Sequence, residues 1–154
     1  MAGLERILLE HPFFRGLDAA AGSLIVGCAR NVVFEPGRYM CREGEPADEF
    51  YLLREGTVAL EIAAPGRAPS VFLTLGEGEI VGVSWLTPPY RWSFDARAVD
   101  RVRALGLDAR CLRAKCEADH DLGYELMKRC LALLTRRLHA TRLQMLDVYA
   151  RPAV

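Results

Sequence analysis

The sequence shows neither an excess of one charge nor a long hydrophobic run. Its 20 Lys and Arg residues balance 20 Asp and Glu residues, which gives a formal net charge of zero. Such a chain has no overall field that would attract nucleic acid or an anionic membrane. No uninterrupted apolar stretch approaches the roughly 20 residues of a membrane-spanning helix, so we expect a cytoplasmic protein. With 154 residues, of which 51% are hydrophobic, the chain is long enough for one soluble domain with its own core.

The sequence also lacks the spacing of a metal site and the motifs of common enzymes. The three histidines have no cysteine or carboxylate at ligand spacing, and no Gly-x-Ser-x-Gly, Walker-type or His-Glu-x-x-His motif occurs. We therefore expect no metal and no enzymatic activity. The cysteines are odd in number and include no Cys-x-x-Cys pair, which argues against a disulfide framework, so we expect mainly buried apolar residues or free thiols. They are Cys28, Cys41, Cys111, Cys116 and Cys130.

Three kinds of segment follow one another along the chain. Apolar residues repeat with helical spacing up to about residue 10, and Asp18 suits the N-cap of a second helix that reaches about Arg30. Short runs rich in Val, Phe, Tyr and Leu then alternate with Pro and Gly turns, which predicts a β-barrel or jelly roll. Helical spacing returns near the C-terminus. We expect one mostly β domain over residues 1–154, with N-terminal helices (1–30), a double-stranded β-helix or jelly-roll barrel (31–110) and C-terminal helices that end in a long dimerisation helix (111–149).

The segment from Met40 to Gly56 carries the most specific pattern. It has a glycine-acid turn at Gly44, then a small residue, a quartet of apolar residues and a closing glycine. This pattern resembles the first signature of the cyclic-nucleotide-binding domain family, the sensor domain of Crp/Fnr-type regulators. The resemblance implies a jelly-roll barrel with Gly44 and Gly56 at its turns. It also implies a site for a small ligand such as the cyclic nucleotides cAMP or cGMP.

The cassette that holds the phosphate in this family is altered at both charged residues. The family has Gly-Glu-x-small-Leu and then Arg-Ser/Thr-Ala, whereas this chain has Gly-Val-Ser-Trp-Leu from residue 82 and Tyr-Arg-Trp-Ser-Phe from residue 90. The resemblance places Val83 at the ribose-binding Glu and Trp92 at the phosphate-binding Arg, so a buried cyclic phosphate would lack its counter-charge. A one-residue slip would instead bring Arg91 to the phosphate. The candidate ligand-binding residues are Gly82, Val83, Ser84, Trp85, Arg91, Trp92, Ser93 and Thr135, the last because family members place a hydroxyl residue of the dimer helix over the adenine.

Four aromatic residues gather around this cassette: Trp85, Tyr90, Trp92 and Phe94. Two interpretations have equal weight. The rings fill the hollow of the barrel and leave no ligand pocket, or they line a surface for a planar ligand or a protein. The adjacent prolines Pro88 and Pro89 stiffen the loop, which favours a role in recognition.

The C-terminal segment repeats apolar residues at alternating steps of three and four from Tyr124 to Val148, which is typical of a coiled-coil seam. We expect a parallel homodimer. Only five residues follow Tyr149, so we expect no helix-turn-helix and no specific DNA binding. The predicted interface residues are Met127, Leu131, Leu134, Leu138, Thr141 and Met145.

These features lead to one main hypothesis and two alternatives. The main hypothesis is a homodimeric regulatory sensor module with an altered phosphate cassette that signals through an unidentified protein partner. The first alternative is a true cAMP or cGMP sensor that uses Arg91 for the phosphate. The second is a dimerisation adaptor with no ligand.

Overall fold

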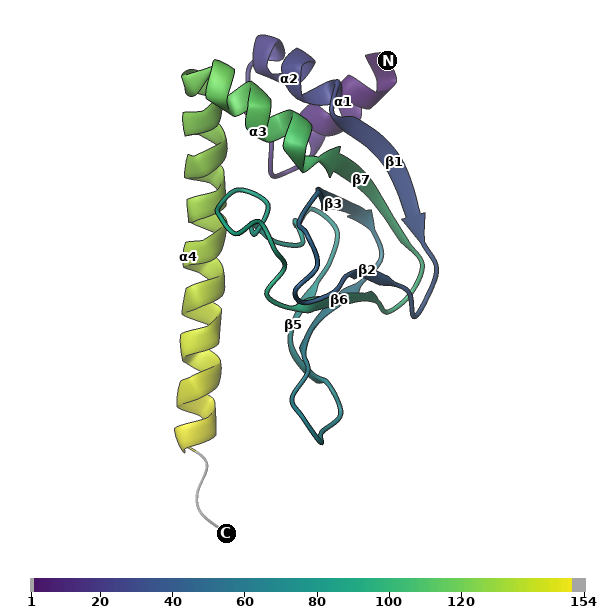
Figure 1. The fold of residues 1–154 in the computed structure, drawn as a ribbon, viewed down its shortest axis with the longest axis vertical. Helices are drawn as coiled ribbons and strands as arrows, with labels where there is room; N and C mark the ends of the chain where they lie inside the picture. Colours follow the sequence, from purple (N-terminus) through teal and green to yellow (C-terminus); the bar gives the residue numbers. More distant parts are fainter. Residues whose placement is uncertain (1, 151–154) are drawn as a thin grey trace.

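The computed structural model describes residues 2–150, which form helices at both ends of the chain and strands between them (Figure 1). The helices are α1 (Ala2–Glu10), α2 (Ala19–Val26), α3 (Ala109–Ala118) and α4 (His120–Ala150). The strands are β1 (Ala29–Phe34), β2 (Tyr39–Cys41), β3 (Glu49–Glu55), β4 (Val58–Ile62), β5 (Ser70–Leu75), β6 (Asp95–Ala98) and β7 (Val102–Asp108).

The strands form two antiparallel sheets. One has the order β1-β7-β3 and the other β2-β6-β4-β5, so both sheets combine strands from distant parts of the chain. Leu52, Leu60 and Leu105 are buried in one core cluster together with other residues of both sheets. The sheets do not close on each other, but their order and packing confirm the predicted jelly-roll class. Gly44 and Gly56 have positive φ angles of 87° and 98°, as expected for turn residues.

The N-terminal helices lie beside α3 at one end of the sheets (Figure 1). The Asp18 carboxylate accepts a hydrogen bond from the Ala21 N–H at 2.8 Å, which confirms the predicted N-cap. The helix ends at Val26 and not near Arg30, because residues from Ala29 onward pair with β7 as strand β1.

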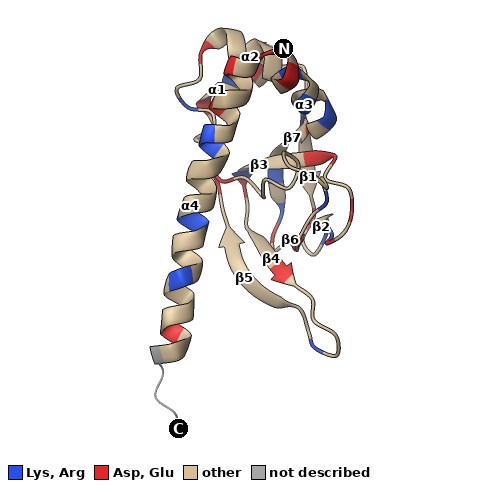
Figure 2. Cartoon of the chain, turned by 60° about the vertical axis from the view of Figure 1, so that its left-hand side comes forward, with Lys and Arg blue, Asp and Glu red and all other residues tan. Residues whose placement is uncertain are grey.

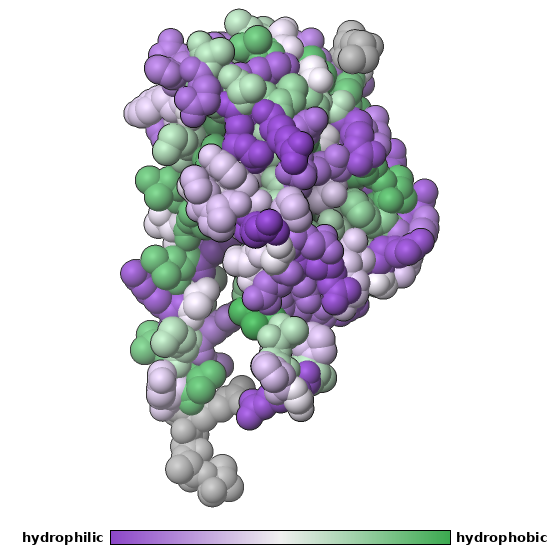
Figure 3. Space-filling view, in the orientation of Figure 1, coloured by the Kyte–Doolittle hydropathy of each residue, from purple (hydrophilic) through white to green (hydrophobic). Residues whose placement is uncertain are grey.

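Helix α4 runs along the sheets and reaches the level of the hairpin between β4 and β5 (Figure 1). One face packs on the core through Leu122, Leu126, Cys130 and Leu133, all of which are buried. Apolar side chains also remain exposed along its length, and Figure 3 shows green atoms along this helix. In Figure 2 its charged residues appear as separate bands and not as one block. No helix within residues 2–150 has the length and apolarity needed to cross a membrane.

The cysteine prediction was wrong for one pair. Cys28 and Cys111 are joined by a disulfide, whereas Cys41, Cys116 and Cys130 are free. The two partners are separated by 83 residues in sequence, so no local spacing could reveal the pair. Antiparallel pairing of β1 with β7 brings the start of one strand to the end of the other, and this places Cys28 beside the first turn of α3.

Candidate functional site

The cassette is the connection between β5 and β6, residues 76–94. This connection contains turns and no helix. The Leu86 N–H donates to the Val83 carbonyl and the Tyr90 N–H donates to the Thr87 carbonyl, each at 3.0 Å. A helix start would present several free N–H groups to an anion, and these turns do not form one.

Two aromatic rings cover the backbone at Gly82. A Cβ atom on Gly82 would lie 2.8 Å from the Phe94 ring and 3.0 Å from the Trp92 ring. The Phe94 ring also contacts Phe72 of β5 edge-on, with ring centroids 6.0 Å apart. The approach to Gly82 is therefore occupied by hydrocarbon, and only glycine leaves room for this packing.

From residue 91 to 94, exposed and buried side chains alternate. Trp92 is buried and Phe94 half-buried, whereas Arg91 and Ser93 are exposed. Arg91 donates a 2.7 Å hydrogen bond to the Gly44 carbonyl. The predicted site residues are thus divided between two faces, and Arg91 does not lie on the face of Trp92.

The other predicted cassette residues differ in burial. Trp85 is fully buried, and its ring stacks on Phe50 with centroids 4.0 Å apart and an interplanar angle of 1°. Its indole Nε1 has no hydrogen-bond partner within the described residues. Val83 and Ser84 are half-buried. The Trp85 ring is thus part of the core cluster.

Helix α3 holds the cassette through Arg113. Its guanidinium donates to the Trp85 carbonyl at 2.5 Å and lies over the Tyr90 ring, 4.2 Å from the ring centroid. A cation above an aromatic face is attracted by the ring quadrupole. Arg113 therefore contacts both the buried turn at Trp85 and the half-buried Tyr90 at the end of the loop.

Helix α4 holds the cassette through Arg137. Its guanidinium donates to the Val81 carbonyl at 3.0 Å and also to the Ile80 carbonyl. Desolvation by the surrounding residues lowers the pKa of Arg137 from its ordinary value. The contact ties the middle of α4 to the residues just before Gly82.

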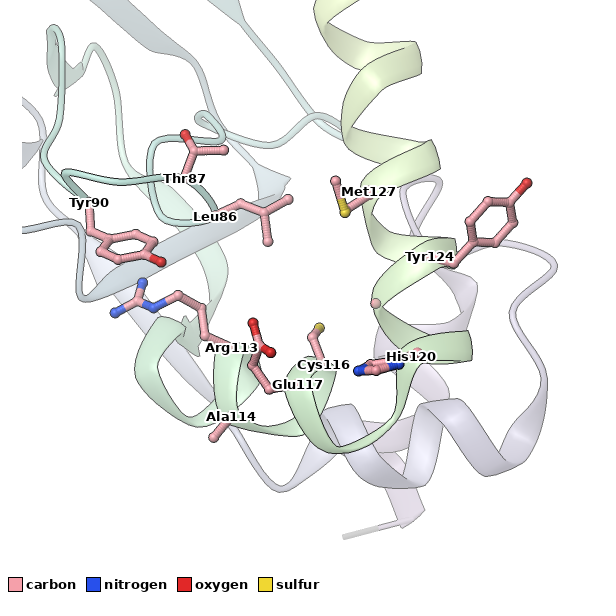
Figure 4. A pocket seen from close by; sticks show the side chains of 11 residues that line it. Leu86, Thr87, Tyr90, Arg113, Ala114, Cys116, Glu117, His120, Tyr124 and Met127 are labelled. Carbon is pink, nitrogen blue, oxygen red and sulfur yellow. The ribbon is translucent and has the colours of Figure 1, made fainter.

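A groove remains between the cassette loop and the two C-terminal helices (Figure 4). Its volume is about 520 Å³, and Leu86 and Tyr90 face it from the loop while Glu117 and Met127 face it from the helices. A second hollow of about 550 Å³ lies next to it and is more apolar, between Val83 and Leu131. Both hollows thus lie outside the barrel, beside the exposed stripe of α4.

The residues predicted on α4 point mainly to solvent. Thr135 donates its hydroxyl to the Leu131 carbonyl within the helix, and Thr141 does the same to Arg137. Neither hydroxyl reaches the cassette by a hydrogen bond within the described residues. All six predicted interface residues are exposed: Met127, Leu131, Leu134, Leu138, Thr141 and Met145.

Sequence reasoning missed Arg113 and Arg137. Arg137 lies next to the seam residue Leu138, and an arginine beside an apolar seam is usually solvated. Its only signal was position, since it lies one helical turn beyond Leu133 on the buried face. Arg113 gave no signal, because its acceptor is a backbone carbonyl 28 residues away.

Known proteins share both the sequence pattern and this fold. The profile of the family "Cyclic nucleotide-binding domain" matches residues 31–119. The chain is 26% identical over 145 residues to a CRP-like cAMP-activated global transcriptional regulator of Mycobacterium tuberculosis; the match covers 94% of this chain and 63% of that protein.

Solved structures agree with this match. A candidate cyclic nucleotide-binding protein from Geobacter metallireducens is 31% identical, with a TM-score of 0.80 over 90% of this chain and 100% of that one. A cyclic nucleotide-binding domain from Methylobacillus flagellatus has a TM-score of 0.79 at 18% identity and covers 99% of this chain and 86% of that one, which supports the fold. The chain therefore belongs to the cyclic nucleotide-binding domain family.

Proposed function

We propose that the protein is a cytoplasmic homodimeric regulatory module that does not depend on an ordinary cyclic nucleotide and that signals through a protein partner. The observation that carries this proposal is the packing of Trp92 and Phe94 over Gly82. Where the family resemblance places the cyclic phosphate, this chain places aromatic rings.

Charge argues against a cyclic phosphate at this position. A buried phosphate needs an arginine and free N–H groups, because an unpaired buried charge costs several kcal/mol or more. Val83 offers no acceptor to a ribose hydroxyl, and Arg91 faces away from Trp92 toward the Gly44 carbonyl. The guanidinium of Arg137 is already bonded to two backbone carbonyls.

The same contacts suggest how the module works without a ligand. Arg137 joins α4 to the cassette from within the chain, so the helix needs no bound nucleotide to stay docked. A module held in this way presents a constant α4 surface to a second subunit and to a partner. The adaptor alternative shares this feature and differs only in having no ligand of any kind.

A dimer through α4 is part of the proposal. Leu131 is 65% exposed and Leu138 is 51% exposed, although both are large apolar side chains on one face of the helix. Exposed apolar stripes of this kind mark interaction surfaces. The seam spacing of three and four residues fits a parallel pair of helices.

Restoring the family residues tests the proposal. A variant with Val83→Glu, Trp92→Arg and Phe94→Ala regains the carboxylate, the cation and the space that the resemblance implies. We expect this variant to bind cAMP in equilibrium dialysis while the natural chain does not. The matched control is Arg91→Ala in the natural chain, which should leave the absence of cAMP binding unchanged.

Each alternative has its own outcome in this experiment. Binding of cAMP by the natural chain that Arg91→Ala abolishes would support the cyclic-nucleotide sensor with the slipped register. A small molecule that copurifies with the natural chain, detected by native mass spectrometry, would exclude the adaptor. We propose no metal and no specific DNA binding, and a sequence-selective shift of a DNA duplex by the purified protein would contradict the latter.

A further inference from the structure

The disulfide lies at the junction between the N-terminal helices and α3. Cys28 follows α2 and precedes β1, while Cys111 is in the first turn of α3, and their Cα atoms are 5.9 Å apart. This separation lies within the range of protein disulfides. The backbone around the pair is well tied, since the Asp108 N–H donates to the Cys28 carbonyl at 2.8 Å.

We propose that Cys28 and Cys111 form a thiol–disulfide exchange site whose substrates are small thiols and disulfides of the glutathione class. Cys28 is only 6% exposed, whereas Cys111 is half-buried. An incoming thiolate therefore reaches the sulfur of Cys111 first.

The exchange balances as two steps. The incoming thiolate forms a mixed disulfide with Cys111, and the bond to Cys28 breaks with both electrons on the Cys28 sulfur, which takes a proton from water. A second small-molecule thiolate then attacks the small-molecule sulfur of this mixed disulfide, forms the oxidised small disulfide, and releases the Cys111 thiolate. The reverse reaction oxidises the two protein thiols and consumes one small disulfide.

The other cysteines do not compete for this chemistry. Cys41 and Cys130 are buried, and burial raises the pKa of each thiol to about 12. Burial also raises the pKa of Cys116. Since the thiolate is the reactive form, these three thiols remain protonated near neutral pH, and Cys28 and Cys111 are the pair that responds.

The disulfide lies close in sequence to a residue that contacts the cassette. Cys111 is two residues before Arg113, which donates to the Trp85 carbonyl and lies over the Tyr90 ring. The first turn of α3 keeps other anchors without the disulfide, because the Ala109 N–H donates to the Asp48 carbonyl at 2.9 Å. Reduction therefore leaves the helix formed and removes its covalent link to the α2 end, where the Lys115 ammonium still donates to the Leu24 carbonyl, and we expect the Arg113 contacts to loosen.

A redox titration of the purified full chain tests both parts. The protein is equilibrated with mixtures of reduced and oxidised glutathione, unfolded in the presence of an alkylating agent, and weighed by mass spectrometry. The chain has five cysteines and three are free in the structure, so the oxidised form takes up three labels and the reduced form five. We expect a full transition between these two masses within the glutathione range.

The two tryptophans of the chain, Trp85 and Trp92, report on the cassette. We expect reduction to shift their fluorescence emission to the red and to lower the melting temperature by about 5–15 °C. Cys111→Ser should reproduce the reduced state under all conditions. Cys116 is a free thiol on the same helix. Cys116→Ser is therefore the control and should keep the redox transition.

Three results would overturn the proposal. Five labels after equilibration with oxidised glutathione would mean that the bond does not form. Three labels at the most reducing mixture would mean that it does not exchange. Identical emission in the two states would remove the link to the cassette. If Cys111→Ser does not fold, the titration of the natural chain still decides all three.

Discussion

Arg137 anchors α4 to the cassette, and replacing it with Met should loosen the helix. Met keeps much of the side-chain volume but donates no hydrogen bond, so the carbonyls of Ile80 and Val81 lose their charged donor. Hydrogen bonds to charged groups contribute about 1.5–3 kcal/mol each. Burial of the cation, which lowers its pKa, offsets part of this gain. We expect Arg137→Met to lower the free energy of unfolding by about 2–4 kcal/mol.

Chemical unfolding followed by tryptophan fluorescence measures this change. The neighbouring Arg136 is exposed and supplies the matched control, because Arg136→Met removes the same charge from the same helix. A surface change of this kind should alter the free energy of unfolding by less than about 0.5 kcal/mol. Equal unfolding midpoints for the two variants would refute the role of Arg137 as the anchor.

Three further predictions concern the dimer, the cassette packing and pH. Leu138→Asp should convert the dimer into a monomer in light scattering at tens of micromolar, because it places two charges in one seam at a cost of several kcal/mol each. Leu143→Asp lies off the seam and should leave the dimer intact. A natural chain that is already monomeric would contradict the predicted seam. Gly82→Ala should cost about 1–3 kcal/mol because its Cβ meets aromatic rings at 2.8 and 3.0 Å, whereas Gly76→Ala, with nothing within 4 Å, should unfold like the natural chain. His11 is buried with both ring nitrogens hydrogen-bonded to the backbone, and desolvation lowers its pKa below 6.5. The unfolded chain therefore binds the proton at a higher pH than the folded chain does. The free energy of unfolding should fall as pH drops below about 6.5. Thermal melts at pH 7.5 and pH 5 should show this loss reduced in a His11→Asn variant, and equal losses in the two proteins would contradict it.

The fold was predictable because its signals are local. The turn glycines Gly44 and Gly56 and the alternating strands each depend on a few neighbouring residues, and the family signature combines them. The buried stripe of α4 was predictable for the same reason, since helical spacing alone places Leu126 and Leu133 on one face.

The anchors of the cassette were not predictable, because they depend on contacts between distant segments. The carbonyls that accept from Arg137 lie 56 and 57 residues earlier in the chain. Any backbone carbonyl can accept such a bond, so no residue type marks the partner. The inward position of Trp92 depends on backbone hydrogen bonds between residues 90–92 and residues 44–47. The sequence alone did not reveal this pairing.

The central claim is that this cassette does not hold an ordinary cyclic nucleotide, and isothermal titration calorimetry of the natural chain with cAMP and cGMP tests it most directly. We predict no saturable heat of binding at protein concentrations of tens of micromolar. Saturable binding of either nucleotide with a Kd of about 1 µM or tighter, a binding free energy of roughly 8 kcal/mol, would contradict the claim.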